Sequence, residues 1–438
     1  MYRVSRILVS RRKQPQLYTY LAEYSQLAKN LHNAALFRMR QNFTAYGKTD
    51  LTDNEAAVMA EIRLLQEHYG SDIRQVLSYV QLERLMRVTE NPDFFSGLPM
   101  QTAQNILKQT VQDFKSWLSA LKAYRKDPGG FTGKPNMPGY RKGDYDTFTV
   151  TNQDAVLYAG ENGTVLKLPK TNIRIPVSHL SPELKLREIK VRPFYDSFEV
   201  LITLETDDIP EVSGQALCAV DLGVNNTAAI VTNTGRSVIY KGGAVKAANQ
   251  WFNKERARLV SEVTMGGKPY RPTRKLDSLS RRRTLFMRDY MHKISHNIIQ
   301  FCIENKVGSV IIGENKGWKQ NSNIGHRNNQ AFVSVPFDML KNQLIYKAEA
   351  AGICVIMQDE TYTSQADFLA GDNCSEQTFS GRRIRRGLYR SATGRTVNAD
   401  LNAAANIMCK AIPEAFDGVT DFSFLQKTKC IRFKDLYH

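Results

Sequence analysis

One stretch decides the fold of the second half of the chain: Leu217-Cys218-Ala219-Val220-Asp221-Leu222-Gly223-Val224-Asn225-Asn226. Its apolar start predicts a short buried strand over 216–220, and a second apolar strand follows over 227–231. Further along come helical patterns over 244–263, 276–305 and 337–350, strands over 309–312 and 353–357, and a last helix from Ala399. Strands alternating with helices predict an α/β domain covering residues 209–438.

Three acids of this domain stand where elements begin or end. Asp221 follows the first strand, Glu314 follows Val310-Ile311-Ile312-Gly313, and Asp400 opens the last helix. Carboxylates at neighbouring strand ends can share one cleft and hold hard cations such as Mg²⁺ through oxygen. Two such ions can activate a water and stabilise the leaving oxygen of a phosphodiester. Each acid alone is more often a turn residue, and Asp400 could be a plain helix cap, but the three together favour a metal centre.

The first half of the chain carries different patterns. A strand over 2–9 precedes helical patterns over 17–35, 61–69, 73–88 and 102–124. A Gly- and Pro-rich segment over 127–142 closes this helical block. Strand patterns then follow over 155–158, 164–168, 173–177, 186–191 and 198–205, with Asn162-Gly163 as a hairpin signal. This order predicts a β-barrel whose first strand is separated in sequence from the others.

Charge and composition narrow the class of partner. Lys and Arg outnumber Asp and Glu by 60 to 43 among 438 residues, which gives a net charge of +17. Positive charges in such excess repel one another unless the protein binds a polyanion. We therefore expect nucleic acid as the partner. No apolar run reaches the ~18 residues that a membrane span requires, and the N-terminus lacks a secretory pattern. The six cysteines are dispersed and form no disulfide framework, which indicates a reduced, cytoplasmic protein without membrane partners.

Three motifs of the chain resemble the RuvC motifs of the TnpB family, the transposon-encoded RNA-guided DNA endonucleases that are similar to compact type V CRISPR effectors. They are Ala219-Val220-Asp221-Leu222-Gly223-Val224-Asn225-Asn226, then Ile311-Ile312-Gly313-Glu314-Asn315, then Asn398-Ala399-Asp400-Leu401-Asn402-Ala403-Ala404-Ala405-Asn406-Ile407. Phe131-Thr132-Gly133-Lys134-Pro135 resembles the linker of that family into its barrel, and Tyr362-Thr363-Ser364-Gln365 resembles the start of its zinc knuckle.

The resemblance implies a multidomain α/β and α+β fold. Residues 1–14 and 128–208 would form a β-barrel wedge domain that holds guide RNA and flanking duplex. Residues 15–127 would form a helical recognition lobe for the guide–target heteroduplex. Residues 209–438 would form an RNase H-like (RuvC) nuclease domain, with a lid insert over 361–398.

The resemblance also implies the chemistry and the partners. Asp221, Glu314 and Asp400 would be the catalytic acids and would bind two Mg²⁺ ions. Guide RNA would pair with target DNA next to a short flanking motif, and the protein would work in the cytoplasm of a prokaryote, associated with the nucleoid in use.

The lid departs from the family pattern. Members usually carry paired Cys-x-x-Cys elements after Thr-Ser-Gln, whereas Ala366, Asp367 and Phe368 stand here. Cys374 is the one cysteine between 361 and 397, and a structural zinc needs four N or S ligands. We therefore predict that this segment binds no zinc and is held by packing or by nucleic acid.

Basic clusters predict the contacts with nucleic acid. The lid carries arginines without an intervening acid, which favours phosphate contact with the strand being cut; they are Arg382, Arg383, Arg385, Arg386, Arg390 and Arg395. Lys316, Trp318 and Lys319 follow Glu314 and could grip a strand by charge and stacking, although Trp318 could equally be buried. Arg281, Arg282 and Arg283 form a basic helix face that we expect to follow a nucleic-acid backbone.

Two alternatives to an RNA-guided endonuclease remain open. A nuclease-silent RNA-guided DNA-binding regulator would be expected to lack one of the three acids, and all three are present. A guide-free RNase H-like nuclease or transposase would not need roughly two hundred residues of preceding domains, judged by ordinary domain sizes.

Overall fold

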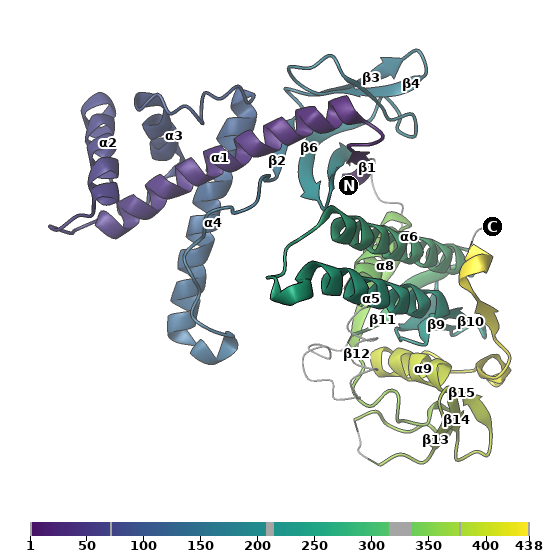
Figure 1. The fold of residues 1–438 in the computed structure, drawn as a ribbon. Helices are drawn as coiled ribbons and strands as arrows, with labels where there is room; N and C mark the ends of the chain where they lie inside the picture. The colour runs from purple at the N-terminus through teal and green to yellow at the C-terminus, as the bar shows by residue number, and fades with distance from the viewer. Residues whose placement is uncertain (1, 71, 207–213, 315–334, 376–377, 437–438) are drawn as a thin grey trace. The chain divides into compact units, whose positions relative to one another are not determined.

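The computed structural model describes residues 2–70, 72–206, 214–314, 335–375 and 378–436 (Figure 1). The chain divides into two compact units, Met1–Asp207 and Asp208–His438. Both contain helices and sheets, so the predicted mixed fold is confirmed at that level. Among the helices of the described ranges, none combines the length and the hydropathy needed to cross a bilayer.

Four helices dominate the first unit: α1 (Pro15–Ala45), α2 (Asp53–Tyr69), α3 (Tyr79–Val88) and α4 (Met100–Lys126). The stripe predicted for the first helix is confirmed, because Leu17, Leu21, Tyr24, Ala28, Leu31 and Ala35 are all buried. Thr52 and Ser78 begin α2 and α3 with capping boxes, in which side chain and backbone satisfy each other's free groups. A short 3₁₀ turn, η1 (Pro128–Gly130), follows α4.

Two antiparallel sheets complete the first unit. One has the order β1-β7-β6-β2, made of β1 (Tyr2–Ser10), β7 (Ser197–Glu205), β6 (Lys185–Phe194) and β2 (Phe148–Thr151). The other has the order β3-β4-β5, made of β3 (Val156–Gly160), β4 (Gly163–Lys167) and β5 (Arg174–Pro176). The pairing of β1 with β7 confirms that the first strand joins strands far along the chain. Strand β2 was not predicted, and closure of the strands into one barrel remains a prediction.

The second unit is built on a six-stranded sheet with the order β12-β11-β8-β9-β10-β16. Strands β8 (Ala216–Asp221), β9 (Asn226–Thr232) and β10 (Ser237–Lys241) are antiparallel neighbours. Strands β11 (Val307–Glu314) and β12 (Cys354–Asp359) run parallel to β8, and β16 (Lys429–Ile431) runs parallel to β10. Strands β10 and β16 were not predicted from the sequence.

Helices cover both faces of this sheet. Cys218 and Val220 of β8 pack in one core with α6 (Arg274–Glu304) and α8 (Phe337–Ala350), and α5 (Gly243–Thr264) packs beside α6. Ala219, which points to the other face, packs in a second core with α9 (Ala399–Ala411). Figure 1 shows α6 and α9 on opposite sides of the sheet. Coverage of both faces explains why β8 is continuously apolar rather than alternating.

The segment predicted as an irregular lid contains more structure than expected. It forms a 3₁₀ turn, η3 (Phe368–Ala370), and a small sheet of β13 (Arg382–Arg385), β14 (Leu388–Arg390) and β15 (Thr396–Asn398). The remaining short elements are η2 (Met265–Gly267), η4 (Ser423–Leu425) and η5 (Phe433–Leu436).

Candidate functional site

Asp221 and Glu314 lie at the same edge of the six-stranded sheet. Asp221 is the last residue of β8, and Glu314 is the last residue of β11. The two strands are parallel, with Val220 opposite Ile312, so their carboxyl ends coincide. Parallel neighbours place functional side chains at this edge because loops leave the sheet there.

Asp400 reaches the same region from α9, which packs on β8. The side chain of Asn398 accepts hydrogen bonds from the backbone N–H groups of Asp400 (2.9 Å) and Leu401 (3.3 Å), so Asn398 is the cap of the helix. The alternative that Asp400 is a plain cap is therefore wrong. Its carboxylate instead accepts a hydrogen bond of 2.6 Å from the side-chain amide of Asn226, the first residue of β9.

Neighbouring carboxylates act on one another in this region. Burial raises the pKa of Asp221 well above its usual value, and the nearby charges of Glu360 and Asp400 raise it further, while Arg383 opposes them. Glu360 and Asp400 are thus each close enough to Asp221 for their negative charges to disfavour its ionised form. A bound cation relieves such repulsion, and an all-oxygen set suits Mg²⁺.

Glu314 is held by a lysine at this edge. Lys341 of α8 places its Nζ 3.3 Å from Glu314 Oε1 and 3.4 Å from Asp338 Oδ1. Within the described residues, no group of three or more His, Cys, Asp or Glu side chains is arranged to hold a metal ion. The structure thus places Asp221 and Glu314 at the same edge of the sheet, with Asp400 close enough to influence Asp221. The carboxylate of Glu314 forms an ion pair with Lys341.

Glu360 is an acid of this region that the sequence analysis did not select. It directly follows β12, and its backbone N–H donates to the carbonyl oxygen of Glu314 at 3.2 Å. A Cβ atom added at Gly313 would clash with Glu360 Oε1, so this carboxylate rests against the backbone of β11. Burial and the charge of Asp359 raise the pKa of Glu360 to about 7, against the effect of Lys341. The available signal was an acid pair, Asp359-Glu360, which begins two residues after the end of the strand predicted over 353–357.

Basic side chains surround the acids. A guanidinium nitrogen of Arg383 lies 3.8 Å from Asp400 Oδ1. Burial lowers the pKa of Lys246 on α5, and the charge of Arg386 lowers it further. Lys246 donates to the side-chain oxygen of Asn225, and Lys241 donates to that of Asn226 at 3.2 Å. The predicted lid arginines are exposed; they are Arg382, Arg383, Arg385, Arg386, Arg390 and Arg395. These exposed basic side chains form a rim that can bind the phosphate oxygens of nucleic acid.

The other basic residues predicted to contact nucleic acid fall elsewhere. Lys316, Trp318 and Lys319 lie outside the described residues. Arg281, Arg282 and Arg283 lie on α6, as predicted. The roles of both groups stay predictions.

Hydrogen bonds order the lid internally and connect it to α9. The buried Asp367 accepts hydrogen bonds from the backbone N–H groups of Leu369 (3.2 Å) and Ala392 (2.7 Å). Asp372 accepts bonds from the N–H of Asp367 and from the backbone and hydroxyl of Ser380. From α9, the buried side chains of Asn402 and Asn406 each donate to the carbonyl oxygen of Ala366. This network gives physical support for the predicted lid held by packing.

Two cysteines bear on the prediction about zinc, Cys374 in the lid and Cys409 in α9. Cys374 is buried and lies close enough to Cys409 of α9 to affect its ionisation. Burial raises the pKa of Cys409, and the neighbouring charge of Cys374 adds to this effect, to a value of about 12. The protonated thiol is therefore favoured over the thiolate that zinc requires. The prediction that this segment binds no zinc remains a prediction.

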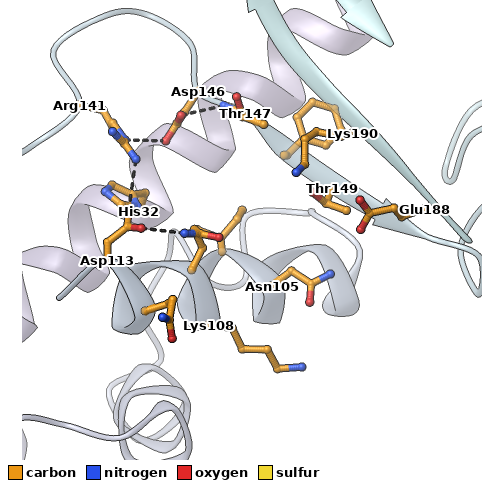
Figure 2. A pocket seen from close by; sticks show the side chains of 14 residues that line it. His32, Asn105, Lys108, Asp113, Arg141, Asp146, Thr147, Thr149, Glu188 and Lys190 are labelled. Carbon is orange, nitrogen blue, oxygen red and sulfur yellow. Dashed lines mark hydrogen bonds and ion pairs between the residues drawn. The ribbon is translucent and has the colours of Figure 1, made fainter. Parts of the chain in front are cut away.

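A polar cavity of about 720 Å³ lies in the first unit, between α1, α4, β2 and β6 (Figure 2). Arg141 is held at its edge by Asp146, at 3.1 Å, and by Asp113, at 3.5 Å. Gln109 of α4 donates to Asp113 at 2.7 Å. The lining also includes amide and ammonium groups, from Asn105, Lys108, Gln112 and Lys190. Side chains of this kind can hydrogen-bond to base edges and phosphates.

Buried His32 forms the back of this cavity. Its Nδ1 lies 3.1 Å from the hydroxyl of Thr110 on α4. Burial and the charge of Arg141 lower its pKa, which favours the neutral ring. This cavity could not be identified from the sequence, because its lining residues are spread along the chain from His32 to Lys190.

Two family models match the second half of the chain. One, described as a probable transposase, matches residues 200–319, and the other, described as a Cas12f1-like TNB domain, matches residues 337–407. The first model contains Asp221 and Glu314, and the second contains Asp400 and the lid.

Curated relatives agree with these matches. The chain is 26% identical to the TnpB-like protein ORF457 of Acidianus two-tailed virus, over 47% of this chain and 44% of the relative. It is 34% identical to the CRISPR-associated endodeoxyribonuclease Cas12f1 of Sulfoacidibacillus thermotolerans, over 28% of this chain and 26% of the relative. The matched regions thus span less than half of each relative's length.

A solved structure is similar over most of the chain. It is the cryo-EM structure of a Cas12f1–sgRNA–target DNA complex, matched with a TM-score of 0.54 at 14% identity. The match covers 89% of this chain and 82% of the other. At this identity the similarity concerns the fold.

Proposed function

Because this chain belongs to the TnpB family, we propose that it is an RNA-guided DNA endonuclease that hydrolyses phosphodiester bonds with Mg²⁺. Its second unit would have the RNase H-like (RuvC) fold, and guide RNA would select the target strand by base pairing. The observation that supports the proposal is that Asp221 and Glu314 end neighbouring parallel strands, while α9, which begins next to Asp400, packs on the first of these strands.

The acids fit a site for divalent ions in their chemistry. Asp221, Glu314 and Asp400 would hold two Mg²⁺ ions, which supply a nucleophile from water and stabilise the leaving oxygen. Asn226 would orient the carboxylate of Asp400 through its 2.6 Å hydrogen bond. Lys341 would release Glu314 as the site fills, because a cation competes with the ammonium group for the same carboxylate.

The basic rim would position the DNA strand. Arg383 contacts Asp400 and extends from an exposed lid strand, so it would contact the phosphate next to the scissile bond. The polar cavity of the first unit would read the short flanking motif. Its amide side chains, Asn105, Gln109 and Gln112, offer paired donors and acceptors that recognise base edges in the major groove.

Substitution of Asp221 tests the proposal. In a plasmid-cleavage assay with guide RNA, Asp221→Ala should reduce cutting by at least ~10³-fold, since removal of a residue that acts in a catalytic unit has effects of this size. Guide RNA binding should stay close to wild type. The matched control is Asp417→Ala, an exposed acid of the same unit, which should cut normally. Undiminished cutting by Asp221→Ala would refute the assignment of this acid.

A further inference from the structure

The helical hairpin formed by α5, η2 and α6 is unusually basic between Trp251 and Arg283. This span has ten Lys and Arg residues and three acids. Two of the acids, Glu255 and Glu262, both pair with one arginine, Arg258. With ten basic residues against three acids, the span keeps an excess of positive charge. A polyphosphate backbone is the partner that best matches such a surface.

Trp251 is half exposed on this basic surface. Its side chain is 49% exposed, whereas the small core of the hairpin consists of Leu259, Leu276 and Leu279 with partly buried Phe252. A large aromatic ring outside the core exposes apolar area that burial would stabilise by ~25 cal/mol per Å². Contact of the Trp251 ring with a flat apolar partner would therefore be favourable, because it would bury this exposed area.

Arginines from the facing helix hold the aromatic rings in place. The guanidinium of Arg282 lies 5.5 Å from the centre of the Trp251 ring, and that of Arg283 lies 5.0 Å from the centre of the Phe252 ring. Arg283 also donates to the side chain of Asn249 at 2.8 Å. The indole and the guanidinium of Arg282 therefore form one surface with both stacking area and charge.

We propose that Trp251 and Arg282 form a stacking site for an unpaired base of guide RNA. A ring stacks on a base only where the base face is open, which selects single strands over duplex. In the proposed function, target DNA pairs with the guide, whereas RNA loops outside that pairing keep open bases. This inference rests on the proposed function and adds a place of RNA contact separate from the acids.

Binding of defined probes tests the site in the full-length chain. The probes are a fluorescein-labelled 20-nucleotide uridylate, a 20-base-pair RNA duplex and a 20-nucleotide deoxythymidylate. Trp251→Leu should weaken binding of the uridylate by about 5- to 100-fold, the size of one lost base stack. Trp251→Phe should keep most of the affinity, and duplex binding should not change. Tyr346→Leu, another exposed aromatic of the same unit, is the matched control and should bind normally.

Tryptophan fluorescence gives a second readout that does not depend on a loss of binding. The chain has three tryptophans, so a Trp117→Phe, Trp318→Phe variant reports on Trp251 alone. Uridylate should quench this emission, and duplex RNA should not. Unquenched emission at saturating uridylate would overturn the proposal.

The remaining outcomes are also decisive. Equal affinity of Trp251→Leu and wild type for uridylate would overturn the stacking site while leaving the endonuclease proposal intact. An effect confined to deoxythymidylate would overturn the assignment to RNA. Wild-type protein that binds no RNA probe would instead refute the RNA-guided function itself.

Discussion

Asn226 shows how a neutral side chain can prepare an acid for its role. It donates to Asp400 at 2.6 Å and accepts from Lys241 at 3.2 Å, so it links the acid to a cation without adding charge. We predict that Asn226→Ala lowers the single-turnover cleavage rate by ~10–100-fold, the usual effect of losing a residue that orients a metal ligand.

The neighbouring amide offers a matched control for this prediction. Asn225 bonds to Lys246 rather than to an acid, so Asn225→Ala should reduce cleavage much less than Asn226→Ala. Melting temperature and RNA binding of both variants should match wild type. If the two variants cut equally well, Asn226 does not position Asp400.

Single residues also mark how far the sequence could predict the site. Asp221, Glu314 and Asp400 could be selected as candidates because each stands at the beginning or end of a recognisable element within a motif. Glu360 was missed because an acid pair after a strand is ordinary turn chemistry, and its contact with Gly313 depends on strand register. The contact between Lys341 and Glu314 was equally hidden, since it joins α8 to the end of β11.

At the scale of elements, the lid depends on one buried carboxylate. Asp367 accepts backbone hydrogen bonds from both ends of the segment, at Leu369 and Ala392. Asp367→Asn replaces one acceptor oxygen with a donor, so one of these two backbone N–H groups loses its acceptor, at a cost of about 1–3 kcal/mol. We predict faster hydrogen exchange over 366–397, measured by mass spectrometry, with unchanged exchange in β8 and β9.

An exposed cap provides the comparison for the lid variant. Asp421 accepts a hydrogen bond from the backbone of Ser423 at the surface, so Asp421→Asn should leave lid exchange at the wild-type rate. Identical lid exchange in Asp367→Asn and wild type would show that packing alone holds the segment.

The start of α2 predicts a dependence on pH. Glu55 accepts hydrogen bonds from Lys48 Nζ at 2.8 Å and from the backbone of Thr52 at 3.0 Å. The hydrogen bond from Lys48 lowers the pKa of Glu55 most, and smaller contributions from other hydrogen bonds bring this pKa to about 2. Because the folded pKa lies below that of the unfolded chain, ionised Glu55 stabilises the fold above about pH 4.5. This contribution is lost as pH falls toward 2.

Urea unfolding of the first unit at several pH values measures this contribution. The free energy of unfolding should fall less between pH 4.5 and pH 2.5 in Glu55→Gln than in wild type. Glu67→Gln, an exposed acid of the same helix, should retain the wild-type slope. Equal slopes for Glu55→Gln and wild type would contradict the expectation.

Helices and strands were predicted well where apolar residues recur regularly over a long stretch. They were predicted poorly where a short strand depends on pairing with a neighbouring strand. The α1 stripe and the strand β8 were read directly from spacing. Strand β13 was missed because all its residues are exposed, and β14 and β15 were missed because each has only three residues, of which one is buried, Tyr389 and Val397. Strand β16 has three residues and acquires its conformation from the edge of β10.

For the whole molecule, the division into two units predicts independent folding. Each buried apolar cluster of the described residues lies within one unit, so neither core needs side chains from the other. We expect residues 2–206, expressed alone, to unfold in one cooperative transition with a native-like circular dichroism spectrum. A fragment without a cooperative transition would contradict this expectation. Residues 214–438 provide the reciprocal fragment.

The pairing partners of two strands emerge late from the ribosome. Strand β1 pairs with β7 about 200 residues later, and β10 pairs with β16 about 190 residues later. At ~5–20 residues per second, each early strand waits roughly 10–40 s before its neighbour exists. During this interval an open strand edge is available to foreign chains, so slower translation of this protein should increase its demand for chaperones.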